Sequence, residues 1–154
     1  MSLNLRRYAV WQFRDFAREK GAALLLVGAL IGFTVIVPIR SFGRPIDEQL
    51  AKVLLTTILQ QVAFILALIS LNGVVSSDRA KGHYRFLFSK PVSISAYYAQ
   101  NFVVYLIGYL VASAALLGLF ATFVHPVAPI RPLIFCLFDF LSLGGIGFLV
   151  STLV

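Results

Sequence analysis

The sequence predicts an all-α fold, a polytopic bundle of transmembrane helices preceded by an amphipathic helix at the membrane surface. Hydrophobic residues make up 60% of the 154 residues and charged residues only 12%, whereas a soluble domain carries about 45–50% and about 25%. The charges are also segregated. None lies within 21–39, 53–77 or 91–130, and Asp139 is the only charge after Arg131. A soluble fold has too much surface to hide four such runs, and a bilayer removes that constraint.

Residues 3–20 are expected to form the interfacial helix, with an apolar face in the acyl boundary and arginines at the lipid headgroups. Trp11 falls outside the apolar stripe, and the alternative is a solvated N-terminal helix. About twenty mixed residues precede the first apolar run, which is therefore an anchor and not a cleaved signal. The stripe contains Leu5, Tyr8, Ala9, Phe13 and Phe16, and the opposite side contains Arg7, Arg14 and Arg18.

Four hydrophobic spans are predicted, at 21–39, 50–75, 94–124 and 133–154. About 20 apolar residues in a helix cross a hydrocarbon core of about 30 Å. Prolines in the segment 125–132 are expected to interrupt the helix before the fourth span. The sequence stops inside the last apolar run, so we expect further spans beyond it. The alternative is a four-span protein with a minimal tail.

The distribution of lysine and arginine predicts the orientation of the spans. Five lie in the first 20 residues and four between 76 and 93, against three in the first connection with Lys52 included and one in the last. The positive-inside rule then places the N-terminus and the segment 76–93 in the cytoplasm. The net charge of +7 is interpreted as contact with the lipid bilayer and its anionic headgroups, and no nucleic-acid partner is expected.

The segment 76–93 combines an acidic–basic pair, a glycine, an apolar trio and a final Pro-Val-Ser. These are Asp78-Arg79, Gly82, Phe86-Leu87-Phe88 and Pro91-Val92-Ser93. With the order of helices around it, the segment resembles the cytoplasmic loop between the second and third spans of type-2 ATP-binding-cassette (ABC) permeases. Asp78 stands where the family usually has Glu, and His83 stands where it often has Thr. Family members generally have six spans, of which this chain would cover four.

The resemblance implies the membrane subunit of an exporter, working as a homodimer or pseudo-dimer in the inner (plasma) membrane of a bacterium. A separate ATPase would hydrolyse ATP and dock on a coupling helix in the loop. An apolar wedge and flanking charges suit such a contact. The alternative is a loop that only lies on lipid headgroups. The coupling residues implied are Asp78, Arg79, Lys81, Gly82, Arg85, Phe86, Leu87, Phe88 and Pro91.

The chain carries no recognisable catalytic constellation, so it is not expected to be an enzyme. It has no Walker-type phosphate loop, and its single cysteine, Cys136, forms no disulfide or metal cluster. We expect no cofactor. Asp139, the only carboxylate within a span, either contacts substrate or partner or reaches interfacial water. Gln60 and Gln61, near the middle of the second span, are expected to hydrogen-bond between helices, with a polar path as the alternative.

Two other classes of function stay open. A structural or assembly subunit of a larger membrane complex would neither transport nor couple to ATP. A secondary transporter is disfavoured, because only one acid lies within a span. The glycines of the last span, Gly144, Gly145 and Gly147, are expected to permit close helix approach rather than ligand binding.

Overall fold

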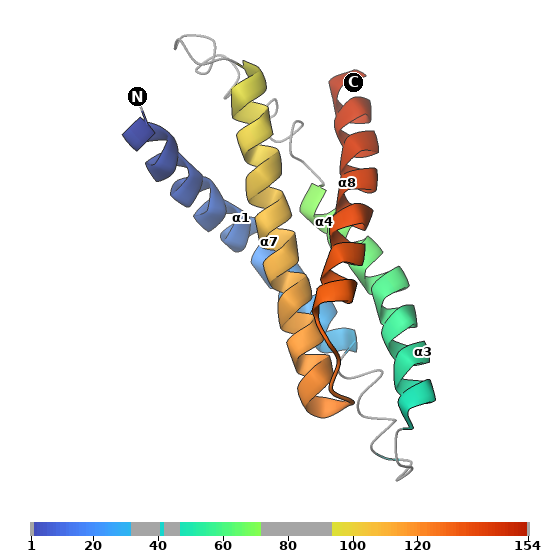
Figure 1. Ribbon diagram of the computed structural model, residues 1–154. Helices are drawn as coiled ribbons and strands as arrows, with labels where there is room; N and C mark the ends of the chain where they lie inside the picture. Colours follow the sequence, from blue (N-terminus) through green and yellow to red (C-terminus); the bar gives the residue numbers. More distant parts are fainter. Residues whose placement is uncertain (1, 32–40, 42–46, 72–93, 154) are drawn as a thin grey trace.

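The computed structural model describes residues 2–31, 41, 47–71 and 94–153, and these residues confirm the all-helical fold, with no strand among them. The helices pack as an elongated bundle (Figure 1). The starts of α1 and α7 lie at the same end of the bundle as the end of α8, and α3 starts at the opposite end. The bounds are α1 Ser2–Ile31, α3 Glu48–Ile58, η2 Leu59–Ala63, α4 Phe64–Leu71, α7 Ile94–Phe123 and α8 Ile130–Leu153.

α1 is one continuous helix of 30 residues, so Gly21 does not separate an interfacial helix from a span within it. A β-carbon on Gly21 would meet nothing within 4 Å. The buried side of α1 contains Gln12, Phe16 and Leu24, and Phe13 of the predicted stripe is 39% exposed. Partial burial of Lys20 lowers the pKa of its ammonium, and the neighbouring Glu19 opposes this shift. The location of this helix at a membrane surface stays a prediction.

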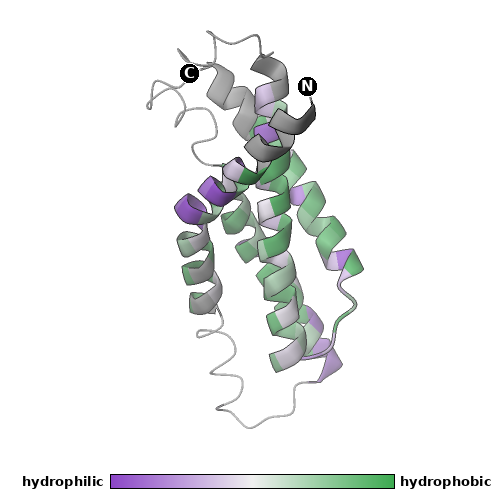
Figure 2. Cartoon of the chain, turned by 90° about the vertical axis from the view of Figure 1, so that its left-hand side faces the viewer, coloured by the Kyte–Doolittle hydropathy of each residue, from purple (hydrophilic) through white to green (hydrophobic). Residues whose placement is uncertain are grey.

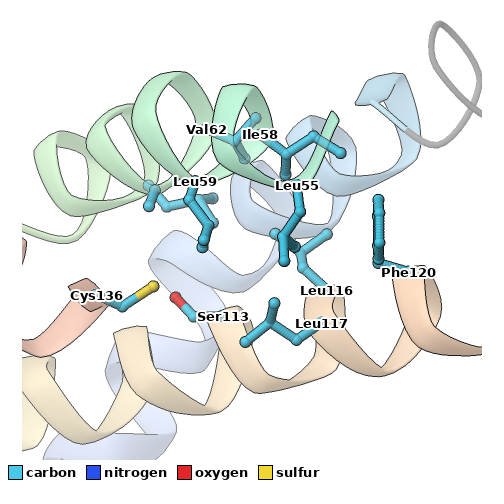
Figure 3. Close-up of a pocket in the computed structure, with 11 residues that line it drawn as sticks. Leu55, Ile58, Leu59, Val62, Ser113, Leu116, Leu117, Phe120 and Cys136 are labelled. Atoms are coloured by element: carbon cyan, nitrogen blue, oxygen red, sulfur yellow. The ribbon is translucent and has the colours of Figure 1, made fainter. Parts of the chain in front are cut away.

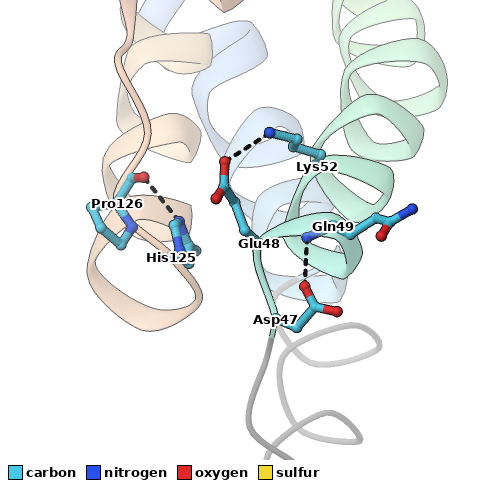
Figure 4. A network of polar contacts seen from close by, with 6 residues as sticks. All are labelled: Asp47, Glu48, Gln49, Lys52, His125 and Pro126. Carbon is cyan, nitrogen blue, oxygen red and sulfur yellow. Dashed lines mark hydrogen bonds and ion pairs between the residues drawn. The ribbon is translucent and has the colours of Figure 1, made fainter.

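α3, η2 and α4 follow one another without a break from Glu48 to Leu71. The Asp47 carboxylate caps the start by accepting a hydrogen bond from the backbone N–H of Gln49 at 2.7 Å (Figure 4). One turn later Lys52 forms an ion pair with Glu48 at 2.7 Å. This pair is well exposed, so solvent screens it and its contribution to stability is small. Both interactions fix the polar start of an otherwise apolar helix.

α7 ends where the prolines begin. The backbone N–H groups of Val124 and His125 both donate to the carbonyl of Phe120, at 2.9 and 3.3 Å. α8 begins at Ile130, three residues earlier than the sequence predicts. Pro132 is compatible with this start, because the first turn of a helix leaves its N–H groups without intrahelical partners and a missing donor costs nothing there.

The core forms where α1, η2, α4, α7 and α8 meet. Aromatic rings join the helices, with centroids 5.1 Å apart for Phe16 and Tyr105 and 5.1 Å for Tyr109 and Phe140. Gly144 permits the predicted close approach: a β-carbon there would lie 2.7 Å from the Phe102 ring, whereas one on Gly145 would meet nothing within 4 Å. The core residues are Phe16, Leu24, Val62, Ala63, Leu66, Ala67, Tyr109, Cys136 and Phe140.

Two helices among the described residues are long and apolar enough to cross a membrane, namely Glu48–Leu71 and Tyr97–Phe123. They correspond to the second and third predicted spans. Figure 2 shows helices that are hydrophobic over most of their length, with hydrophilic residues in short stretches. Large apolar side chains also face outward, including Val111, which is 56% exposed, and Phe138, which is 63% exposed. Hydrocarbon is a favourable surrounding for this surface.

Candidate functional site

Asp139 lies near the middle of α8, and its side chain is half-buried against α7. Its neighbour there is Tyr109, which is fully buried. The Oδ2 atom of Asp139 is buried and has no hydrogen-bond partner among the described residues. The Asp139 carboxylate therefore lies against protein groups of α7. Its expected contact with substrate or partner, or with interfacial water, stays a prediction.

Tyr109, Ser113, Cys136 and Asp139 form a polar cluster between α7 and α8, hereafter the α7–α8 polar cluster. Tyr109 and Ser113 are four residues apart, and Cys136 and Asp139 three, so each pair shares one helix face. The Tyr109 hydroxyl lies within electrostatic range of the other three side chains. Tyr109 and Cys136 have no exposed area, and Ser113 is 4% exposed. The cluster thus places a carboxylate, two hydroxyls and a thiol inside the bundle.

The side chains of the α7–α8 polar cluster lie close to one another, but few are in ideal hydrogen-bond geometry. The Tyr109 hydroxyl, the Ser113 Oγ and Asp139 Oδ2 are buried, and none makes a hydrogen bond of ordinary length and angle among the described residues. A buried polar group without a partner costs about 1–3 kcal/mol. Buried polar groups are normally hydrogen-bonded, so these positions are candidates for a site that binds a water molecule, an ion or a ligand group. The sequence analysis singled out Asp139 and missed Tyr109 and Ser113, although their spacing of four residues on one helix face is a readable signal.

A small apolar cavity lies beside this cluster, between the helix 48–71 and α7 (Figure 3). Its volume is about 20 Å³, room for about one water molecule. The Ser113 hydroxyl and the Cys136 thiol lie near one another at its edge, and the remaining walls are hydrocarbon. The apolar walls are Leu55, Ile58, Leu59, Val62, Ala63, Leu66, Leu116, Leu117 and Phe120.

A second polar contact joins α1 to the first half of α7. The side-chain amide of Gln12 donates to Asn101 Oδ1, and Gln100 Nε2 donates to Gln12 Oε1 at 3.0 Å. Gln12 and Asn101 are 8% and 7% exposed. Interhelical bonds of this kind are worth about 0.6–2 kcal/mol in membrane proteins. The sequence analysis did not identify these residues, because a single Gln in a mixed helix carries no positional signal.

Gln60 and Gln61 lie in the π-helical turn η2, and both are exposed on the outside of the bundle. The expected hydrogen bonds between helices are therefore not found within the described part of this chain. Val62 and Ala63, the next two residues, point inward and are buried. A π-helical turn in an α-helix is rare and is frequent at functional sites.

At the other end of the bundle, His125 lies in the loop after α7, where its Nδ1 is 3.0 Å from the carbonyl oxygen of Pro126 (Figure 4). The described residues contain no group of three His, Cys, Asp or Glu side chains able to hold a metal ion. The proposed coupling residues in the segment 76–93 lie outside the described residues. Gly147 lies within α8, but its surroundings are outside what the structure describes.

Comparison of the chain with protein-family models, with curated proteins and with solved structures finds no match.

Proposed function

We propose that this protein is the membrane-spanning permease subunit of an ABC-type exporter and works with a separate ATPase. The observation that carries the proposal is the sequence of the segment Asp78–Ser93, whose residues resemble, in the same order along the chain, the coupling loop of type-2 ABC permeases. This segment lies in the sequence between Glu48–Leu71 and Tyr97–Phe123, the two helices apolar enough to cross a membrane. A coupling loop needs such a position, because motion of the ATPase reaches the membrane through the helices on either side.

The arrangement of helix ends also supports the proposal. The start of α1 and the start of α7 lie at one end of the bundle (Figure 1). Those two ends adjoin the two segments richest in lysine and arginine. If both face the cytoplasm, as the positive-inside rule predicts, the segment 76–93 is on the side where ATP is hydrolysed.

Inside the membrane, the α7–α8 polar cluster is the place where a moving bundle would meet a polar substrate. Asp139 supplies an acceptor, and Tyr109 and Ser113 supply hydroxyls that both donate and accept. An acid within a span is costly and marks a functional position more often than a structural one. We propose that changes in the packing of α7 against α8 open this cluster during transport.

The test of the proposal is recovery of the ATPase with the full chain. Replacing both Phe86 and Phe88 by Ala removes two aromatic anchors, which cost on the order of 2 kcal/mol each at protein interfaces. The complex should then weaken several-hundredfold, since about 1.4 kcal/mol is tenfold. Co-purification of the ATPase and ATP hydrolysis by the complex are measured, and circular dichroism checks that helical content is unchanged.

A charge variant is the matched control. Arg85→Glu should reduce coupled ATP hydrolysis with a smaller loss of affinity, because charges at the rim of an interface act mainly on register and association rate. If the full complement of ATPase remains after both aromatic residues are lost, or if none accompanies the unchanged chain, the exporter proposal fails. A non-transporting structural subunit then becomes the better interpretation.

A further inference from the structure

The Asp139 carboxylate has no positively charged partner in the described helices that pack most closely against α8. These are α7, α4 and η2. Neither α4 nor η2 contains an ionisable side chain, and those of α7 are tyrosines alone, of which Tyr109 adjoins the carboxylate. Arg131, on α8 itself, is exposed and lies about 12 Å away along the helix axis. The charged residues of α1 end at Lys20, and α1 packs against α7 and α4.

The position of Asp139 along the bundle also keeps charged groups at the helix ends out of reach. Its neighbour Tyr109 lies close to the midpoint of α7, about 20 Å from either end of that helix. A lysine or arginine side chain beside either end of α7 spans only a fraction of that distance. Phe135, one turn before Asp139 on α8, is 45% exposed. The open side of the carboxylate therefore shares its surroundings with an apolar ring, and in a bilayer those surroundings are hydrocarbon.

Only a very small positive group fits beside this carboxylate. An ionised carboxylate without a partner is strongly unfavourable in such surroundings, and it is neutralised by binding a cation or a proton. The described residues contain no group of three side chains able to hold a metal ion. The cavity beside the α7–α8 polar cluster has a volume of about 20 Å³ and almost wholly apolar walls. A metal ion needs more oxygen ligands and an organic ammonium group needs more room, whereas a proton needs neither.

We propose that Asp139 is a proton-binding site of the helical bundle, occupied while α7 and α8 are packed together. The proton is held on Oδ2, the buried oxygen. The neutral carboxyl group then both donates and accepts hydrogen bonds beside the Tyr109 hydroxyl. When α7 and α8 separate and water reaches the carboxyl group, the Oδ2–H bond breaks, its electron pair stays on the carboxylate and the proton passes to a water molecule. Each opening and closing of this helix pair thus releases and takes up one proton.

The proton site goes beyond the proposed export function, because it requires neither ATP nor an ATPase. Its experiments therefore use the chain alone. Loss of ATPase binding by the Phe86 and Phe88 variant and the protonation state of Asp139 are separate results, so either proposal can fail without the other.

The first experiment is infrared spectroscopy of the full chain in lipid vesicles at neutral pH. A protonated carboxyl group has a carbonyl stretching band that an ionised carboxylate lacks. Asp139→Asn should abolish this band. Asp47→Asn, at the exposed start of α3, is the matched control and should keep it. Tyr109→Phe should shift the band without removing it, because the hydroxyl beside the carboxyl group is lost. Absence of the band from the unchanged chain, or its persistence in a helical Asp139→Asn chain, overturns the proposal.

The second experiment measures thermal unfolding of the same chains in detergent from mildly acidic to neutral pH. The packed bundle holds a proton that a water-exposed carboxylate releases, so its stability is full in acid and falls as the pH rises through the range in which the packed bundle releases that proton. For one proton, the unfolding equilibrium constant rises by at most about tenfold per pH unit. Asp139→Asn should remove this dependence. Asp47→Asn keeps a capping side chain and should retain it. An equal pH dependence of the Asp139→Asn and unchanged chains rules the proton site out.

Discussion

At Gly108, the absence of a β-carbon lets the ring of Phe16 from α1 lie against the backbone of α7. A β-carbon there would overlap the ring, with Cδ1 and Cζ each at 2.8 Å. Gly28 allows a similar approach on α1, where a β-carbon would lie 3.1 Å from Leu116 Cδ2. Small residues that let helices approach closely are a main source of packing in membrane proteins. Single atoms therefore set the distance between α1 and α7.

Gly108→Ala should destabilise the protein by about 1–3 kcal/mol, the usual cost of overpacking. Gly118→Ala is the matched control on the same helix, since a β-carbon there would meet nothing within 4 Å, and Ala is favoured over Gly in a helix. Thermal unfolding in detergent should show a lower Tm for the first variant and an equal or higher Tm for the second. Adding Phe16→Leu to Gly108→Ala should restore part of the loss. Equal Tm values for the two glycine variants would contradict the close contact.

The Asp139 carboxylate is expected to make insertion of the α8 segment into the membrane less favourable. We expect it to be present because the function requires it. An acid at the centre of a span costs about 2.5–3.5 kcal/mol by insertion measurements, and Leu is slightly favourable there. Asp139→Leu should therefore favour insertion of the α8 segment by about 3 kcal/mol, measured with glycosylation reporters. The same variant should lose transport-coupled ATP hydrolysis, and Asp139→Asn should fall between. A Leu variant with full activity would show that the carboxylate has no functional role.

At the scale of helices, hydrogen bonds between side chains fix the pairing of α1 with α7. Apolar packing holds the other helix pairs together. Gln12 and Asn101 are separated by 89 positions in the sequence and are buried together. The contact between Phe16 and Tyr105 lies one helical turn further along each of the two helices. A buried amide pair admits fewer registers than an apolar contact, because a shift of one residue breaks it.

A double-mutant cycle tests this pairing. Gln12→Ala and Asn101→Ala should each destabilise the fold by about 1–2 kcal/mol, and the double variant should lose little more than one of them, because both remove the same bond. Val10→Ala, at a position 67% exposed, is the control and should leave stability within about 0.5 kcal/mol. Unfolding midpoints of the four chains give the coupling energy. Additive losses would mean that the two side chains act separately.

For the whole molecule, the orientation in the bilayer is the property on which the proposed function depends. The starts of α1 and α7 share one end of the bundle, and Asp47, Glu48 and Lys52 lie at the start of α3, towards the other end (Figures 1 and 4). The excess of lysine and arginine near the first end predicts that it faces the cytoplasm.

Cysteine labelling of intact cells tests this orientation. In a chain with Cys136 replaced by Ala, Ser41→Cys should react with a membrane-impermeant maleimide, and Ser89→Cys should react only after the cells are opened. The physical reason is that basic segments near span ends are retained in the cytoplasm during insertion. Equal labelling of both positions in intact cells would contradict the four-span topology.

The sequence alone predicted the helical class and the approximate bounds of the helices after residue 47, but not that α1 runs unbroken through Gly21. Long charge-free runs in a bilayer leave the backbone no partner except itself, so they must be helical. The range predicted for the third span, 94–124, differs by one residue from α7, Ile94–Phe123. The sequence predicts the start of the last span at 133, but α8 begins at Ile130, because the first turn of a helix accepts a proline such as Pro132.

The tertiary structure decided which side of each helix faces its neighbours. A helix that is apolar on all sides has no stripe that marks its buried face, so the sequence could not show that Gln60 and Gln61 face outward or that Tyr109 lies beside Asp139. These relations depend on contacts between residues far apart in the chain. They follow from close packing of side chains, as between Gly108 and Phe16, and no periodicity within a single helix contains that information.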